Sequence, residues 1–480
     1  MAVDLEFEPV ERQDALPDPA PVDSRSGALR ELLRVAIPLI VSSGSQSLMH
    51  VIDRIFLTWW SVEAVAASLP AGVLFWALLS LPFGTAVYTN TFVAQYTGAG
   101  KPERVAASVW QGVWFATLCG VLLGVCIPAA PLLLSWTGHF GVVGRMEVEY
   151  FAILMYGSLP ALLSVACSAY FSGRGRTVVV MWVNIAAMLV NLVLDYMLIF
   201  GAGPVPEMGI RGAAWATNLA NVFSCVTFGL LAGFSMLHEG YPLWQTWRID
   251  RELMHRMLRF GLPTGVQQLV DVGAFLMFVV FVGRLGTPEL AATTIAFNLN
   301  SLAFIPMFGL GTAVMTVVGR RMGERRPDAA ATTTWCGFWV GMIYMGVFIF
   351  LYLAAPRLML LPYAPANDAE EFARVENMVV MLLRFVALYS FFDAMVVVFG
   401  SAIRGAGDSR FSLLWSFGTG WTLMVLPCWW LVRTNGSLAA CWWTVSLYIM
   451  VQGIGFLLRF LGGRWRTMSV IEHEPAESNP

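Results

Sequence analysis

The sequence predicts an all-α membrane protein with twelve transmembrane helices in two pseudo-symmetric six-helix lobes. Three observations predict this fold: the composition, the alternation of positive charge between apolar segments, and an internal repeat. Of the 480 residues, 58% are hydrophobic and only 12% are charged, which is about half the charged share of a typical soluble domain. The excess apolar surface must face lipid. A net charge of −2 gives no reason to expect a nucleic-acid partner.

Twelve segments are long and apolar enough to cross a bilayer, which takes about 20 residues. They are residues 35–60, 64–96, 105–135, 147–172, 177–200, 210–237, 255–284, 289–319, 330–360, 376–402, 411–432 and 437–461. The first contains the polar stretch SSGSQSLMHVID. We keep it as a span because polar residues within a membrane usually face protein or a water-filled cavity.

Positive charge tests the number of spans. If the amino terminus is inside, most of the 29 Lys and Arg residues fall at the inner ends of the spans and only a minority at the outer ends. Cytoplasmic loops carry this excess of positive charge, and a wrong span count would scramble the alternation. We therefore expect a multi-pass protein of the cell membrane with both termini in the cytoplasm.

The chain also repeats itself. RVAIPLI with Pro38 matches RFGLPTG with Pro263, and KPERVAASVWQG (101–112) matches RPDAAATTTWCG (326–337), both at the same offset along the chain. Each half contains six spans, so both halves begin on the same side of the membrane. They are therefore parallel repeats, related by an axis along the membrane normal, with a site expected between them.

The spans and the repeat together predict five parts of the chain. These are a disordered cytoplasmic tail (1–28), an N-lobe (29–240), a cytoplasmic linker (241–253), a C-lobe (254–461) and a second cytoplasmic tail (462–480). The first tail lacks the apolar core of a cleavable signal peptide.

Two acidic residues of the first half lie deep in the membrane, where a carboxylate costs at least about 2.5–3.5 kcal/mol on insertion scales. Asp53 follows the inner-end residue Arg34, and Asp195 follows Arg176, by the same spacing, which corresponds to about 28 Å of helix. Asn191 shares a helical face with Asp195, and Thr217 enters from the outer side. We expect Asp53, Asn191, Asp195 and Thr217 to meet at one level in the outer half of the N-lobe.

The second half contains another acidic pair. Asp271 follows Arg259, and Asp393 precedes Arg404, by roughly three helical turns in each case. These spacings place the two carboxylates about 18 Å and 16 Å from the inner face. They predict a second acidic cluster, near the middle of the membrane.

Both clusters suit ion coupling. Paired buried carboxylates can take up and release a proton, whereas carboxylate, amide and hydroxyl oxygens are the ligands that hard cations prefer. The residue types therefore allow H⁺ or Na⁺. Hydrogen bonding to neighbouring backbone or Arg groups is the alternative for any single aspartate.

The motifs that carry these residues also form a recognisable series. They are AIPLIVSSGSQSLMHVIDRIFL with Pro38 and Asp53, VNLVLDYMLIFG with Asn191 and Asp195, GIRGAAWAT with Thr217, GLPTGVQQLVD with Pro263 and Asp271, and FFDAMVVVFGSAIRGAGDSR with Asp393. In order and spacing the chain resembles the multidrug and toxic compound extrusion (MATE) family of antiporters over residues 30–460.

The resemblance implies a two-lobe fold that exchanges outward- and inward-facing states. It implies that Asp53, Asn191, Asp195 and Thr217 form the family's first-lobe cation site, where any Na⁺ is transported rather than a resident metal. Asp271 and Asp393 fall at the second-lobe acidic positions. The seventh-span acid is often Glu in relatives, whereas this chain has Asp271, whose side chain is shorter.

Four further residues have alternative interpretations. His50 lies three residues before Asp53 and could tune its protonation, or be a packed histidine. Arg384 could be a counter-charge in the cavity, a snorkelling side chain or part of a structural ion pair. Pro38 and Pro263 are expected kinks, and bending at them is a candidate gate, with a static kink as the alternative.

We therefore expect a secondary active antiporter that exports organic, often cationic, compounds in exchange for H⁺ or Na⁺ by alternating access. The alternative is a flippase for a lipid-linked saccharide or lipid of the same superfamily, which usually has a more cationic cavity. A membrane-embedded enzyme would need clustered Asp-rich or His-bearing loops, and the sequence has none. The expected partners are the lipid bilayer and small organic molecules, with no cofactor and a monomeric state.

Overall fold

The structure, a computed structural model, describes residues 24–135, 141–203, 205–240, 246–360, 369–434 and 436–472. Twelve helical segments in these ranges are long and apolar enough to cross a membrane. Each coincides with one of the twelve predicted spans, and the described residues contain no strand. The prediction of twelve spanning helices is confirmed, including the polar first one.

The N-lobe contains six spans, some of them built from two or three consecutive helices. Its elements are α1 (Arg25–Trp60), α2 (Val62–Val87), α3 (Thr89–Gly98), α4 (Pro102–Val125), η1 (Ile127–Ala129), α5 (Ala130–Leu134), α6 (Gly141–Tyr156), α7 (Ser158–Gly173), α8 (Thr177–Phe200) and α9 (Ile210–His238). The first helix begins at Arg25, inside the tail expected at 1–28, because Ser24 caps it by accepting a hydrogen bond from the Gly27 N–H. Residues 1–23 lie outside the described residues.

The C-lobe repeats this arrangement. Its elements are α11 (Arg251–Gly283), α12 (Thr287–Gly323), α13 (Pro327–Ala354), α14 (Pro356–Leu360), α15 (Ala369–Ala406), α16 (Ser409–Thr419), the π-helix η4 (Gly420–Val425), α17 (Leu426–Arg433), α18 (Leu438–Leu461) and the short η5 (Arg464–Thr467). Helix α11 begins inside the linker expected at 241–253, because the Asp250 side chain accepts from the N–H groups of Glu252 and Leu253. Residues 241–245 lie outside the described residues.

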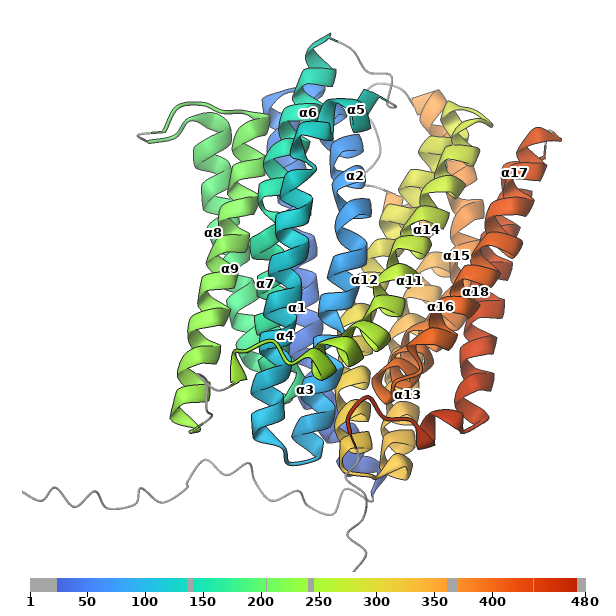
Figure 1. Ribbon diagram of the computed structural model, residues 1–480. Coiled ribbons are helices and arrows are strands. Elements are labelled where there is room, and N and C mark those ends of the chain that lie inside the picture. Colours follow the sequence, from blue (N-terminus) through green and yellow to red (C-terminus); the bar gives the residue numbers. More distant parts are fainter. Residues whose placement is uncertain are drawn as a thin grey trace, which may run out of the picture.

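The two lobes stand side by side (Figure 1), with the blue-to-green helices in one group and the yellow-to-red helices in the other. We call the end at which α1 begins and α18 ends the inner end, and the opposite end the outer end. The helices of the two groups diverge towards the outer end in this view. The lobes contact each other mainly through α1 with α12, α2 with α11, and α3 with α12.

Two close contacts between the lobes are related by the sequence repeat. A Cβ atom on Gly84 would collide with the Cα atom of Gly265, and one on Gly309 would collide with the Cα atom of Ile40. Gly84 and Gly309 occupy equivalent positions of the repeat, as do Ile40 and Gly265. The same helix crossing therefore occurs twice, as α2 over α11 and as α1 over α12.

A second pair of contacts closes the inner end in the same symmetric way. A Cβ atom on Gly98 would collide with the carbonyl oxygen of Arg320, and one on Gly323 with the carbonyl oxygen of Gln95. These positions are again equivalent in the two halves of the sequence. We call the four glycines, Gly84, Gly98, Gly309 and Gly323, the glycine seal. It lets α2, α3 and α12 approach the opposite lobe backbone to backbone.

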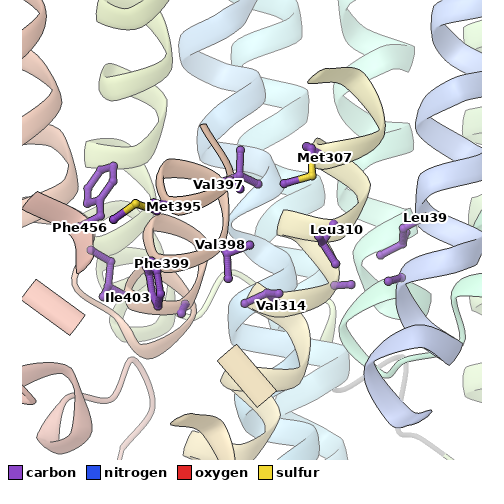
Figure 2. Packing of buried hydrophobic residues seen from close by; sticks show 14 of the residues in the cluster. Leu39, Met307, Leu310, Val314, Met395, Val397, Val398, Phe399, Ile403 and Phe456 are labelled. Carbon is purple, nitrogen blue, oxygen red and sulfur yellow. The ribbon is translucent and has the colours of Figure 1, made fainter. Parts of the chain in front are cut away.

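Apolar side chains of both lobes pack against each other near Leu310, the residue after Gly309 (Figure 2). Leu39 of α1 lies across from Leu310 of α12, so the hydrophobic core is continuous between the lobes at this level. Further into the C-lobe, Val398 and Phe399 of α15 and Phe456 of α18 are fully buried in the same cluster. This packing makes the inner half of the molecule a closed unit.

The segment after α18 adds one more connection at the inner end. The backbone N–H of Val470 donates to Gln95 Oε1 of the N-lobe at 3.0 Å. Glu472 pairs with Arg256 of the C-lobe at 2.6 Å. Trp465, at the turn into this segment, is completely buried. The part of the predicted tail from 463 to 472 is thus docked on both lobes, whereas 473–480 lies outside the described residues.

Candidate cation-coupling sites

The four predicted N-lobe residues come from three helices and meet at one place. Asp53 lies on α1, Asn191 and Asp195 lie on α8, and Thr217 lies on α9. All four are buried, and both Asn191 and Asp195 are completely so. The structure thus brings the four side chains together within the N-lobe.

Hydrogen bonds connect the four side chains. With its amide nitrogen turned towards the carboxylates, Asn191 donates to Asp53 Oδ1 at 2.9 Å and to Asp195 Oδ2 at 3.1 Å. The Thr217 hydroxyl donates to Asp53 Oδ2 at 3.4 Å, a long contact, and to the Ala213 carbonyl at 3.1 Å. We call Asp53, Asn191, Asp195 and Thr217 the N-lobe cluster.

One oxygen of this cluster has no partner in the ranges that the structure describes. Asp195 Oδ1 is buried and accepts no hydrogen bond from the described residues. A buried carboxylate oxygen without a donor is costly, and either a bound proton or a cation would satisfy it. Turning the Asn191 amide by half a revolution would place its oxygen between the two carboxylates. The cluster would then present only oxygens towards a hard cation.

Two further residues stand next to the cluster. His50 Nδ1 lies 4.0 Å from Asp53 Oδ2, but the His50 side chain is 66% exposed. The structure thus places His50 at the edge of the cluster, beyond hydrogen-bond distance. Tyr150 of α6 is buried within electrostatic range of both Asp53 and Asp195. No pattern in the sequence pointed to Tyr150, because its helix contains no other residue of the cluster.

The C-lobe acids are arranged differently. Asp271 of α11 lies 3.5 Å from the amide nitrogen of Gln267, one turn earlier on the same helix. That amide also donates to Ser416 Oγ at 3.0 Å, and Gln452 donates to the same hydroxyl at 2.8 Å. Asp271 is therefore the end member of an amide–hydroxyl chain across α11, α16 and α18.

Asp393 of α15 has a separate environment. It is buried, and its Oδ2 atom has no hydrogen-bond partner among the described residues. The Tyr389 hydroxyl, one turn earlier, also lacks a partner there. Tyr448 of α18 is within electrostatic range of both Asp271 and Asp393. Within the described ranges, however, no hydrogen bond joins the two acids, so the predicted second cluster consists of two neighbouring single carboxylates.

The remaining candidates lie outside both acidic sites. Pro38 is buried within α1, two residues from the crossing at Ile40, and Pro263 lies within α11, two residues from the crossing at Gly265. Both prolines thus stand where the lobes touch. Arg384 is exposed on α15 and makes no ion pair within 4.0 Å in the described part of the chain.

The comparison with protein families gives the identity. The sequence model of the MatE family matches residues 38–197 and 263–430, more than half of the chain. The chain belongs to the MATE family. The two matches begin at Pro38 and Pro263, which are equivalent positions of the internal repeat.

Individual MATE relatives match nearly end to end. The probable multidrug resistance protein NorM of Thermotoga maritima is 26% identical over 455 residues, which cover 93% of this chain and 95% of that protein. The multidrug resistance protein PmpM of Pseudomonas aeruginosa is 27% identical over 403 residues, 82% of each chain. A solved outward-facing structure of a multidrug resistance MATE family transporter superposes with a TM-score of 0.82 at 22% identity, covering 92% of this chain and 97% of that one.

These matches confirm the all-α, two-lobe fold of twelve helices. MATE proteins are membrane transporters, so this protein is a multi-pass membrane transporter and not an enzyme. Transporters of this family need no cofactor, and they act on small molecules. The expectation of an antiporter that exports organic compounds is confirmed at the level of the family.

Proposed function

We propose that this MATE protein exports organic, often cationic, compounds in exchange for H⁺ or Na⁺, and that the N-lobe cluster binds the coupling ion. One observation carries the proposal. Asn191 lies within 3.1 Å of both Asp53 and Asp195 in a buried place, and one carboxylate oxygen there has no partner among the described residues. A membrane protein keeps such charge where ions or protons move.

Ion binding there would change the charge of the cluster. Without an ion, two carboxylates face each other across one amide; with a proton or Na⁺, the excess negative charge falls by one. In a medium of low dielectric constant this change in charge strongly alters the local free energy. An ion that binds better in one conformation shifts the equilibrium between outward- and inward-facing states.

The coupling ion is H⁺ or Na⁺, and the Asn191 amide offers a physical basis for either. In the donor orientation it holds two carboxylates together, one of which can carry a proton. In the opposite orientation it supplies a third oxygen type for Na⁺, besides the carboxylates and Thr217. Asp271 and Asp393 form a second acidic region in the C-lobe that would attract cations towards the cavity.

The relatives support export of organic compounds over lipid flipping. The NorM and PmpM relatives carry multidrug resistance names. A flippase of the same superfamily usually has a more cationic cavity, whereas this chain has four acids, Asp53, Asp195, Asp271 and Asp393, well inside its spans. We further propose a monomer in the bacterial inner membrane, with both termini cytoplasmic and with lobes bounded at 29–240 and 254–461.

Dye efflux from everted membrane vesicles tests the proposal. A pH gradient and a Na⁺ gradient are applied separately to the wild type, Asp53→Asn and Asp195→Asn. We expect at least one gradient to drive dye efflux by the wild type. In both variants the rate of this gradient-driven efflux should fall at least about tenfold, which corresponds to about 1.4 kcal/mol. Wild-type efflux that ignores both gradients, or variants that match the wild type, would falsify ion coupling through this cluster.

A matched control is available at the inner end. Asp328 is 88% exposed and pairs with Arg466 at the surface, so Asp328→Asn makes the same chemical change outside the membrane. Exposed ion pairs contribute little to stability. This control should therefore transport like the wild type, and any loss in it would point to a general effect of removing acids.

A further inference from the structure

A small polar cavity lies within the N-lobe, inward of the N-lobe cluster. Its volume is about 20 Å³, which accommodates one water molecule. Its polar lining consists of Gln46 from α1, Asn184 from α8, and Asn221 and Ser224 from α9. Met49 and Met188 are among the apolar residues that complete the wall. None of these residues belongs to the N-lobe cluster.

The lining follows the cluster with one fixed spacing on all three helices. Gln46 precedes Asp53 by seven residues, and Asn184 precedes Asn191 by seven. Ser224 follows Thr217 by seven on α9, which runs in the opposite direction. Seven residues are nearly two helical turns, so each polar side chain lies on the same helical face, about 10 Å nearer the inner end. The three helices that build the cluster thus build a second, uncharged polar level below it.

Most of this polar lining has no hydrogen-bond partner in the described part of the chain. Asn184 donates to Ser42 Oγ at 2.5 Å. No hydrogen bond to the side chains of Gln46, Asn221 or Ser224 occurs within the described residues. Gln46 is exposed and Ser224 is buried, so the polar lining leads from the surface of α1 into the lobe. Polar groups inside a membrane protein require partners, and a cavity with this volume and two to four polar groups meets the conditions for an ordered water.

We propose that this cavity is a relay site that holds an ordered water molecule and passes the coupling ion between the N-lobe cluster and the inner end. For H⁺, the water and the surrounding amide and hydroxyl groups form a hydrogen-bonded step. For Na⁺, the same oxygens replace part of the hydration shell. The site carries no formal charge, so it binds an ion weakly enough to release it.

The position of the cavity inside the N-lobe suits the passage of an ion towards the inner end. The route between the lobes is closed from the level of Gly84 and Gly309 to the inner end by the glycine seal. The cavity is lined by N-lobe helices alone, so an ion that passes through it need not cross that interface. Further inward, Ser42 and the Asn184 side chain continue the polar face. The relay rests on the proposed function, since it needs an ion at the N-lobe cluster.

The water is tested directly, without transport. Radiolytic hydroxyl labelling of the purified protein, followed by mass spectrometry, reports methionines beside ordered water, and Met49 and Met188 both line the cavity. We expect labelling of these residues in the wild type and its loss in Asn221→Leu, which fills the polar space with an apolar group of similar size. Absence of label in the wild type would show a dry cavity and overturn the proposal.

The relay is tested by rate. In Asn221→Leu and Ser224→Ala, turnover under the effective gradient should fall by about tenfold, while the ion affinity, measured by tryptophan fluorescence, and the thermal midpoint stay unchanged. Met188→Leu changes the apolar wall of the same cavity and should behave like the wild type. Variants that turn over at the wild-type rate, or that lose ion affinity, would overturn the relay. A wild type that ignores both gradients fails the proposed function instead, and the labelling still decides whether water occupies the cavity.

Discussion

The two lobes use similar sequences to hold acids in the membrane in different ways. In the N-lobe, two carboxylates share one amide donor, so four side chains from three helices act as a unit. In the C-lobe, Asp271 ends an amide–hydroxyl chain, whereas Asp393 lies one turn after Tyr389, whose hydroxyl has no hydrogen-bond partner among the described residues. The repeat that relates the helices does not relate the acidic sites. If two acids form a shared site, substituting either one should lower the efflux rate as much as substituting both. If the acids act separately, the effects of the two substitutions should multiply.

The largest expected effect comes from the two acids of the N-lobe. Asp53→Asn and Asp195→Asn should each lower gradient-driven efflux by about 100-fold, or about 2.7 kcal/mol. The double variant should be no worse than either single one, because groups that act as a unit are not additive. Initial rates of dye efflux from everted vesicles give the double-mutant cycle. A double variant about 10,000-fold slower than the wild type would contradict the shared site.

The bridging amide should have the next largest effect. Asn191→Leu keeps the approximate volume and removes the donor between the carboxylates, so efflux should fall by about tenfold to 30-fold. Asn191→Asp supplies oxygens only and should impair proton coupling more than Na⁺ coupling, since it adds a third carboxylate. Ion-gradient titrations of both variants measure this. Full activity of Asn191→Leu would mean that the acids function independently.

In the C-lobe the effects should be smaller and additive. Asp271→Asn and Asp393→Asn should each reduce efflux by about threefold to tenfold, and the double variant by the product. The same vesicle assay gives this second cycle. If the double variant equals either single one, the C-lobe acids form a shared site and the contrast between the lobes disappears.

The smallest effect is expected at Thr217. Its contact with Asp53 is 3.4 Å long and its hydroxyl keeps a second partner in the Ala213 carbonyl. Thr217→Val should therefore lower efflux by about twofold to threefold, in line with the loss of one weak hydrogen bond. Thr217→Ser is the control and should restore the wild-type rate. A loss as large as that of Asp195→Asn would show that Thr217 binds the ion directly.

The number of spans and the proximity of the four N-lobe cluster residues could both be predicted from the sequence, and the reasons are physical. Lys and Arg mark helix ends, and a helix has a fixed rise, so counting from Arg34 and Arg176 gave the common depth of Asp53 and Asp195. The same counting placed Asp271 and Asp393 at one level. Depth does not specify lateral position, however, and the counting could not show that no hydrogen bond joins them within the described ranges.

Other parts of the site had weaker signals or none. Gln267 lies one turn before Asp271 on the same helix face, so helical spacing could have found it. Ser416, Gln452 and Tyr150 belong to helices that carry none of the acids predicted for the two sites, and only the packing within each lobe brings them in. The docking of the segment 463–472 on both lobes could not be predicted from the sequence either, because so short a segment has no periodic pattern.

The glycine seal limits how far the two halves of the chain can diverge. The halves differ at most positions, yet each has glycine at two equivalent places of close approach to the backbone of the other lobe, Gly84 with Gly309 and Gly98 with Gly323. A methyl group at any of these places would push apart helices that belong to opposite lobes. The two halves can therefore hold their acids differently, as the unlike acidic sites show, while the paired glycine contacts that join them leave no room for a side chain in either half.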